Sequence, residues 1–327
     1  MLVTDLFRVL AALEKFRDAV HRAGAVERDN GGDIFERFRP QRGAYARDAR
    51  RFKLEYAGGL ARGEHVEHGR IVHRDGVDGE IVGRSTATAE DNTLPKRYKA
   101  VADVGPVYGI SMEKVLALQP DLILISKNQH EKWLPLFEEN HIPAIALSTK
   151  TYDDVKHALR IAGEVYGHED KAESKIAQMD DKMKAITSKV PKEHVRIAII
   201  HATPSQVTLE LPTSIAGSMA TQLGFQNIVT ENMDGFVMSG ERLPYSMEVL
   251  VQQDPDIIYI TSMGAKEKIE NQLANHVEND PAWSLLQAVK AGRVYTLPQY
   301  GYLISPGLSY PDYVAYMARL VYPEVHI

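Results

Sequence analysis

The chain contains no cysteine. This absence excludes disulfides, cysteine-ligated zinc, iron–sulfur clusters, thiol nucleophiles and a lipid-anchor cysteine from this sequence. No run of 18 or more apolar residues is present, so no segment has the pattern of a membrane helix. The net charge of -6 lacks the basic excess of a nucleic-acid binder. What is present is an ordinary composition, 44% hydrophobic and 25% charged over 327 residues, which is long enough for two domain-sized cores.

Signals for export and for catalysis are also lacking. In the first 24 residues Arg8, Glu14, Lys15 and Arg17 interrupt the apolar positions, so we expect no signal peptide in this sequence. There is no Gly-x-Ser-x-Gly, no phosphate-binding glycine loop and no His-Glu-x-x-His. We therefore expect a protein that is not an enzyme and has no cofactor of its own.

The basic residues change in type near residue 78. Residues 1–77 contain 13 Arg and 2 Lys, whereas the rest of the chain contains 7 Arg and 16 Lys. Either residue serves on a solvated surface, so folding does not require the change. We interpret residues 1–78 as an atypical Arg-rich segment of different coding origin, frameshifted or foreign, with a natural Arg-rich extension as the alternative.

From residue 79 onward, short apolar runs alternate with helical patterns. The runs LILIS (122–126) and AIALS (144–148) predict strands, and residues 130–142 between them predict a helix. A second series begins with RIAIIHA (196–202) and continues with DIIYIT (256–261) and RVYTL (293–297), with helices near 214–223, 246–253, 266–276, 281–290 and 310–322. This alternation predicts two α/β lobes, residues 79–151 and 194–327.

The segment between the two series is helical in pattern. Apolar residues recur at helical spacing over residues 152–190, and the segment has no proline before Pro191. It is too long for a crossover within one sheet. We therefore predict that residues 152–193 form a long interlobe helix, or a helix pair, joining the lobes.

An internal repeat links the two series. SMEKVLALQPDLILI (111–125) and SMEVLVQQDPDIIYI (246–260) align without a gap at an offset of 135 residues. In each copy the serine can cap a helix, the glutamate lies in its first turn, and Pro-Asp precedes a strand. Each lobe is therefore expected to contain the same helix–strand unit, and both strands should lie in different sheets.

These motifs resemble a known family. GEIVGRS (79–85), LPKRYKAVADVGPVYGISMEKVLALQPDLILIS (94–126), VYGHEDKAESKI (165–176), the second Ser-Met-Glu copy and NDPAWSLLQAVKAGRVYTLP (279–298) together resemble the substrate-binding proteins of ABC importers for iron siderophores, heme and cobalamin. The resemblance is especially close to the heme-binding lipoproteins of Gram-positive surface iron systems. It covers about three quarters of the chain.

The resemblance implies a fold, a function and partners. The fold would be the class III periplasmic-binding-protein fold, α/β, with two lobes joined by one rigid backbone helix and the ligand held in the cleft. The function would be capture of an iron chelate, heme or cobalamin and delivery to an ABC permease outside the cytoplasm, by a monomer that binds no nucleic acid. Glu113 and Glu248 match the surface glutamates, one per lobe, that dock onto permease arginines.

The chain also departs from this family. The place of the first strand of lobe 1 is held by the Arg-rich segment, so lobe 1 is expected to lack that strand or to fill its position wrongly, and residues 1–77 are expected to pack poorly. One alternative is a non-functional or cytoplasmic remnant of such a protein. A more remote alternative is a metallochaperone or enzyme on a nitrogenase-like scaffold, although such proteins need cysteines for their clusters.

Ligand-binding residues are expected after the strands, where open α/β sheets bind ligands. The candidates on this rule are Arg84, Tyr108, His201, Met238, Met263, Tyr300 and Tyr302. In the similar heme proteins the iron takes a methionine and a histidine, and the matching positions here are Tyr108 and Met263. Tyrosinate and methionine both serve as heme-iron ligands. The transported ligand is thus expected to be heme or a ferric siderophore, and few cleft arginines favour heme or a neutral chelate.

Overall fold

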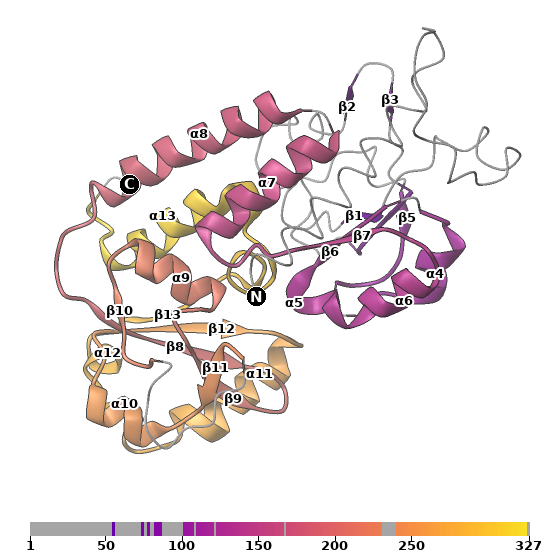
Figure 1. Cartoon of the computed structure of the whole chain (residues 1–327). Helices are drawn as coiled ribbons and strands as arrows, with labels where there is room; N and C mark the ends of the chain where they lie inside the picture. The colour runs from indigo at the N-terminus through magenta and orange to yellow at the C-terminus, as the bar shows by residue number, and fades with distance from the viewer. Residues whose placement is uncertain are drawn as a thin grey trace, which may run out of the picture. The chain divides into compact units, whose positions relative to one another are not determined.

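The structure is a computed structural model, and it describes residues 54–55, 73–74, 77–78, 82–86, 101–107, 109–120, 122–166, 168–230 and 240–325. No helix within these ranges is long and apolar enough to cross a membrane. The chain divides into two compact units (Figure 1). Unit 1 comprises the described residues up to 147 and residues 159–173. Unit 2 comprises residues 148–158 and the described residues from 174 to 325.

Unit 1 is built on a parallel five-stranded sheet with the order β5-β4-β1-β6-β7. Its strands are β1 (Leu54–Glu55), β4 (Gly83–Arg84), β5 (Ala102–Asp103), β6 (Ile123–Ser126) and β7 (Ala144–Leu147). The two apolar runs that predicted strands are thus confirmed as β6 and β7. A separate antiparallel pair is formed by β2 (His73–Arg74) and β3 (Val77–Asp78).

The position of the first strand in this sheet is filled, so the alternative that unit 1 lacks this strand is wrong, whereas the alternative that the position is wrongly filled stays a prediction. β1 comes from the Arg-rich segment and pairs in parallel with β4 on one side and with β6 on the other. The register places Leu54 opposite both Gly83 and Ile123. Two residues suffice because a central strand is held by hydrogen bonds on both edges. Residues 1–53 lie outside the described residues, and the prediction that residues 1–77 pack poorly is untested there.

The helices of unit 1 pack an apolar core against this sheet. They are α4 (Met112–Ala117), α5 (Lys127–His130), the 3-10 helix η3 (Glu131–Trp133) and α6 (Leu134–Glu139). The helix predicted at 130–142 is therefore present in three short pieces. The core consists of Val104, Ile110, Val115, Ile123, Ile125 and Phe137.

The segment 152–187 is a pair of helices, α7 (Tyr152–Tyr166) and α8 (Glu169–Thr187), and not one continuous helix. Each contributes residues to both units. In unit 2 the Tyr152 hydroxyl donates to Asp180 Oδ1 over 2.8 Å. In unit 1 Arg160 pairs with Glu173 at 2.7 Å. The helix-pair alternative is thus the one found.

Unit 2 contains a six-stranded mixed sheet. The order is β11-β9-β8-β12-β13, with β10 also paired to β8. The strands are β8 (Arg196–Ala202), β9 (Val207–Glu210), β10 (Gln226–Asn227), β11 (Arg242–Pro244), β12 (Ile257–Ser262) and β13 (Val294–Thr296). β8, β10, β12 and β13 pair with one another in parallel. β9 pairs antiparallel with β8 and with β11, and the sequence patterns predicted neither β9 nor β11.

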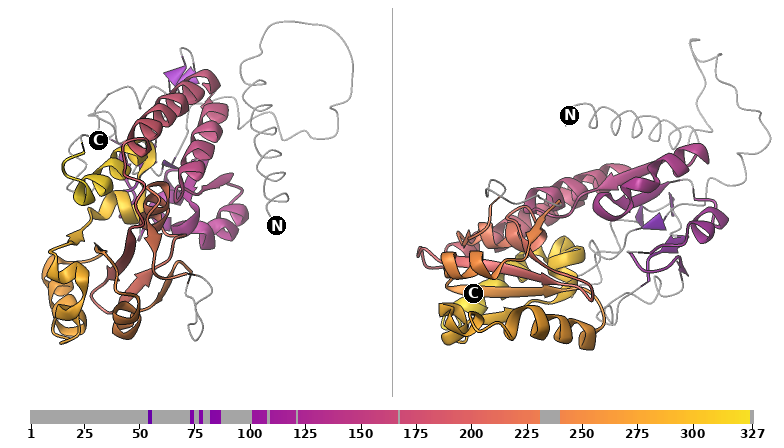
Figure 2. Two further views of the ribbon diagram at one scale, coloured as in Figure 1. Left: turned by 90° about the vertical axis from the view of Figure 1, so that its left-hand side faces the viewer. Right: turned by 90° about the horizontal axis from the view of Figure 1, so that it is seen from below.

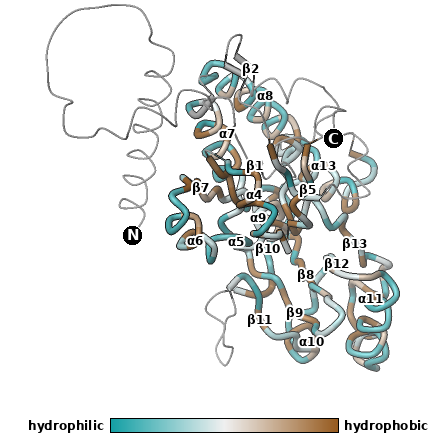
Figure 3. Tube along the Cα trace, turned by 90° about the vertical axis from the view of Figure 1, so that its right-hand side faces the viewer, coloured by the Kyte–Doolittle hydropathy of each residue, from teal (hydrophilic) through white to brown (hydrophobic). Residues whose placement is uncertain are grey.

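Helices cover both faces of this sheet (Figures 1 and 2). On one face lie α9 (Ile215–Gln222) and α13 (Tyr310–Val321), which contact each other. On the other lie α10 (Met247–Gln253), α11 (Lys266–Leu273), the π-helix η4 (Ala274–Glu278), the 3-10 helix η5 (Trp283–Leu285) and α12 (Gln287–Lys290). Figure 3 shows hydrophobic residues along β8 and hydrophilic ones along most of α11. Every helix predicted for this half of the chain is thus present, with shifted ends.

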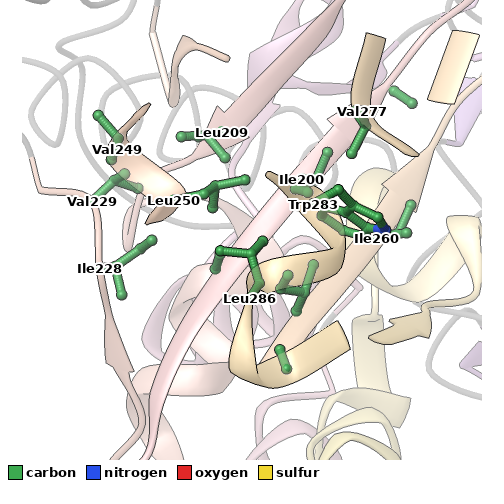
Figure 4. Close-up of a cluster of buried hydrophobic side chains, with 14 of the residues drawn as sticks. Ile200, Leu209, Ile228, Val229, Val249, Leu250, Ile260, Val277, Trp283 and Leu286 are labelled. Carbon is green, nitrogen blue, oxygen red and sulfur yellow. The ribbon is translucent and has the colours of Figure 1, made fainter. Parts of the chain in front are cut away.

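The core of unit 2 lies between the sheet and the α10–α12 layer (Figure 4). Trp283 and Leu286 pack there with Ile200 and Ile260. Because side chains alternate along a strand, residues 201, 208, 210 and 261 lie on the opposite face, which α9 and α13 cover. The sheet therefore separates an apolar face from a face that carries polar groups.

The two copies of the sequence repeat adopt the same local structure. α4 leads to β6 in unit 1, and α10 leads to β12 in unit 2. The Ser111 hydroxyl caps α4 by accepting from the Lys114 N–H, and the Ser246 hydroxyl caps α10 by accepting from the Val249 N–H. Because β6 and β12 belong to different sheets, the prediction of two separate sheets is confirmed.

Candidate functional site

The carboxyl edge of the unit 2 sheet brings together two of the predicted ligand-binding residues. His201 is the penultimate residue of β8, and Met263 directly follows β12, the parallel neighbour of β8. The Met263 N–H donates to the Ala202 carbonyl over 3.0 Å, which fixes the distance between the two strand ends. Met263 is half-buried. This edge is where parallel α/β sheets carry ligand sites.

His201 belongs to a buried polar cluster. Its Nδ1 lies 2.9 Å from Thr261 Oγ1, and the Thr261 hydroxyl donates to Glu210 Oε1 over 2.5 Å. His201 is 2% exposed and Glu210 is 0% exposed. Burial, and secondarily the positive charge of Arg242, lower the pKa of His201 to about 3. The imidazole is therefore neutral, and its 3.5 Å approach to Glu210 Oε1 is not an ion pair.

Glu210 is the fully buried acid of this cluster. Burial raises its pKa, and the charge of Arg242 and the hydrogen bonds from Thr261 and Ser214 act in the opposite direction without outweighing burial. Arg242 lies directly opposite Glu210 in the β9–β11 register. Thr208 Oγ1, Glu210 Oε2 and Arg242 Nε are buried without a hydrogen-bond partner among the described residues. Unpaired buried polar atoms are costly, and these three lie on the paired strands β9 and β11.

In unit 1 the predicted residue Arg84 ends β4 and is 9% exposed. Its Nη1 lies 3.7 Å from Asp103 Oδ2 on the neighbouring strand β5. Burial acts to raise the pKa of Asp103, but the Thr86 hydroxyl, the Gly105 N–H and the charges of Arg84 and Lys114 outweigh it and lower that pKa. Asp103 is thus a carboxylate, and it offsets much of the positive charge that Arg84 would offer an anionic ligand.

Tyr300 and Tyr302 are buried in unit 2, within the π-helix η6 (Tyr300–Ile304). The Tyr302 side chain is 0% exposed, its hydroxyl donates to the Tyr313 carbonyl over 2.6 Å, and its ring stacks edge-on against the Tyr313 ring. Both tyrosines are thus at least as buried as His201, and their part in ligand binding stays a prediction.

Two further candidates, Tyr108 and Met238, lie outside the described residues. The residue before Tyr108 is nonetheless fixed. His130 Nε2 lies 2.5 Å from the Val107 carbonyl, and the His130 ring is buried. The backbone at Val107 is thus held by a residue of helix α5.

The predicted docking glutamates are both exposed. Glu113 lies in the first turn of α4 and Glu248 in the first turn of α10. At these positions the carboxylates complement the positive end of the helix dipole and are free to meet a partner. Val251, one turn after Glu248, and Leu285 on the contacting helix η5 are 46% and 62% exposed, and they are the exposed large hydrophobic residues of the described chain.

Sequence reasoning missed Glu210, Thr261 and Thr208. A glutamate in the short run VTLEL reads as a solvent-facing strand residue, because Val207, Leu209 and Leu211 take the apolar positions. Its burial depends on α9 and on strands far away in the sequence. No group of three or more His, Asp or Glu side chains suited to a metal ion occurs in the described residues.

Comparisons with known proteins agree with this architecture. Residues 70–300 match the model of a family described as periplasmic binding protein. The putative ABC transporter substrate-binding lipoprotein YhfQ of Bacillus subtilis is 24% identical over 205 residues. The match covers 61% of this chain and 63% of YhfQ, so this chain spans less than two thirds of that relative. The high-affinity heme uptake system protein IsdE of Staphylococcus aureus is 21% identical over 256 residues, 76% of this chain and 83% of that protein.

A solved structure shares the fold. The crystal structure of S. aureus IsdE complexed with heme superposes with a TM-score of 0.67 at 19% identity and covers 83% of this chain and 98% of that one. The family match spans well over half of the sequence, from before β3 to η6. The chain therefore belongs to the periplasmic binding protein family, whose members are transport-related substrate-binding proteins.

Proposed function

We propose that this chain is the substrate-binding component of an ABC importer, that it captures an iron chelate, heme or cobalamin outside the cytoplasm, and that it delivers this cargo to a membrane permease. One observation carries the proposal. In a chain of this family, two helices of different units repeat the same Ser-Met-Glu start and each presents an exposed glutamate in its first turn. A single glutamate of this kind would be explained by the helix dipole alone.

The surroundings of Glu248 support docking to a permease. Exposed apolar side chains beside a charged group are typical of protein–protein interfaces. Val251 and Leu285 supply such side chains on and beside the helix of Glu248. A permease surface with an arginine for Glu248 and an apolar rim for Val251 and Leu285 would cover them. Glu113 would meet a second arginine.

Heme is the first ligand to test. IsdE, by its name, is a heme uptake protein, and its heme complex shares the fold of this chain. Arg84 is partnered by Asp103, which disfavours a strongly anionic siderophore. Tyr108 in unit 1, and either Met263 or His201 in unit 2, have the chemistry of axial ligands to heme iron. Met238 remains a candidate contact by its sequence position.

Hemin added to the whole chain should give a tyrosinate-type absorption spectrum that is lost in Tyr108→Phe. The phenolate oxygen is a good ligand for ferric iron, and phenylalanine removes only that oxygen. The measurement is a visible absorption titration of both proteins. Tyr302→Phe is the matched control, because its hydroxyl is already bound to the Tyr313 carbonyl, and its spectrum should equal that of the parent. An unchanged spectrum in Tyr108→Phe would remove Tyr108 from the site and leave the ligand class standing.

A further inference from the structure

The two exposed glutamates of the sequence repeat have different apolar surroundings. Val251 and Leu285, on α10 and on the contacting helix η5, are 46% and 62% exposed, and no other large hydrophobic residue is exposed among the described residues. Glu113 therefore has no such neighbour in the described part of unit 1. Val251 aligns with Leu116 in the repeat, and Leu116 is half-buried. In the described chain, the exposed apolar surface thus belongs to the unit 2 copy, beside Glu248.

The charges next to the two glutamates differ as well. The residue after Glu113 is Lys114, which is exposed and donates from Nζ to the Asp103 carbonyl over 3.4 Å. The residue after Glu248 is Val249, which lies in the core of unit 2. An arginine that approaches Glu113 therefore meets a lysine beside it, whereas an arginine that approaches Glu248 meets no like charge at the equivalent position. Like charges brought together across an interface weaken it.

The exposed position of Leu285 is fixed by its neighbours. Trp283 and Leu286 pack in the core of unit 2, so the 3-10 helix η5 is held at both of its ends (Figure 4). The Gln287 N–H donates to Asp254 Oδ1 over 2.9 Å, which joins the start of α12 to the residue after α10. Leu285 is thus presented beside α10 by packed elements. A surface that is already ordered loses little conformational freedom when a partner binds it.

Helix α10 completes this surface. It exposes Glu248 and Val251 and buries Val249 and Leu250 in the core. Glu248 and Val251 are three residues apart, so they are neighbours on the helix surface. Together with Leu285 they form the unit 2 docking surface, an acid beside two apolar side chains. Apolar side chains exposed singly are common, whereas adjacent ones beside a charged group are typical of an interface with another protein.

We propose that the two docking points are unequal: the unit 2 docking surface is the main contact, made with an apolar side chain that the permease places beside its arginine, and Glu113 adds a weaker electrostatic contact. The proposal rests on the proposed function and states the chemistry of the partner at this site. Salt should separate the two contacts. The Debye length falls from about 8 Å at 0.15 M salt to about 3 Å at 1 M, which screens exposed charges. Burial of Val251 and Leu285 depends on apolar area removed from water, so salt does not weaken it.

The first test identifies what covers Leu285. In cells that make the whole importer, Leu285 is replaced by the photoreactive residue p-benzoylphenylalanine, and Lys268, an exposed residue of α11, is replaced in the same way as the control. Light should join position 285, and not position 268, to a membrane protein with several spanning helices, within one helical turn of an arginine. A cross-link from position 285 to a soluble protein or to a second copy of this chain would overturn the proposal, as would the absence of a cross-link.

The second test measures the affinity of the purified chain for that permease in lipid nanodiscs, at about 0.15 M and about 1 M NaCl. Leu285→Ser should weaken binding about ten-fold at both salt concentrations, since burial of a leucine contributes roughly that much. Glu113→Gln should weaken binding about three-fold at the lower salt concentration and leave it unchanged at the higher one. Lys268→Ser is the control and should bind as the parent does.

Unchanged binding in Leu285→Ser, or a loss in Glu113→Gln that is as large and persists at the higher salt concentration, would overturn the unequal contacts and leave docking through the glutamates standing. Ligand capture is measured separately, and Leu285→Ser should bind hemin as the parent does. If the parent chain binds no chelate, the proposed function fails, whereas the cross-link from position 285 still decides which partner covers this surface.

Discussion

Reversing the charge of both docking glutamates, Glu113→Lys with Glu248→Lys, should abolish permease-dependent uptake and leave ligand binding unchanged. Each lysine would face a permease arginine, and like charges brought together across an interface cost several kcal/mol, which corresponds to at least about a hundred-fold loss of affinity. The fold should survive, because a cation in the first turn of an exposed helix costs only about 0.3–1 kcal/mol. Uptake of labelled ligand by cells carrying the permease, beside binding by the purified variant, makes the measurement.

The matched control for this pair is Glu267→Lys. Glu267 is also an exposed acidic residue in the first turn of a unit 2 helix, α11, but it is not part of the Ser-Met-Glu repeat. Its reversal carries the same helix-dipole cost and should leave uptake normal. Normal uptake by the Glu113–Glu248 double variant would contradict docking through these residues. Equal losses in the control would assign the effect to net charge.

Replacing Gly217 by alanine should destabilise unit 2, although alanine is ordinarily the better helix residue by about 1 kcal/mol. Gly217 lies in the first turn of α9, and an added Cβ would collide with the carbonyl oxygen of Leu211 and with the backbone of Pro212. Backbone atoms cannot swing aside, so α9 would have to shift. Overpacking of this kind costs about 1–3 kcal/mol. A shift of Leu211 would also move its neighbour Glu210, so the hydrogen bonds that join Glu210, Thr261 and His201 should weaken.

Denaturant unfolding of the parent and of Gly217→Ala measures the difference in the free energy of unfolding. The sign of this difference shows whether the clash with Leu211 or the higher helix propensity of alanine is the larger effect. A lower midpoint with an unchanged slope shows that the close packing of α9 governs. A higher midpoint would show that helix propensity governs and that α9 does not press on Leu211. Ala220→Gly on the same helix provides the calibration for a change that creates no clash: it should cost about 1 kcal/mol from helix propensity and about 0.8 kcal/mol from the loss of a buried methyl group.

The elements that sequence reasoning predicted are those with a strong local signal. β8 and β12 are uninterrupted apolar runs, and α10 has both a capping serine and an acidic first turn. The exposure of Glu113 and Glu248 followed from the same capping pattern. In these segments the residues themselves decide the structure.

The elements that were missed depend on distant partners. β1 has only two residues and sits in an Arg-rich stretch, so its strand character comes from β4 and β6 on either side. β9 and β11 exist because they pair with each other, and β9 also pairs with β8. The His201 cluster draws on three strands spread over sixty residues, and neither Glu210 nor Thr261 signals its burial locally. These elements therefore form through pairing with distant strands, which local sequence patterns do not predict.

The central claim, capture of an iron chelate, heme or cobalamin, is tested most directly by equilibrium dialysis of the whole chain against hemin, a ferric catecholate siderophore, a ferric hydroxamate siderophore and cobalamin in turn. Each compound is measured on both sides of the membrane at several concentrations. The account predicts that at least one is retained saturably at about one molecule per chain, with hemin the first expectation. Retention of none of the four by a folded chain would contradict the claim and favour a remnant that has lost its cargo.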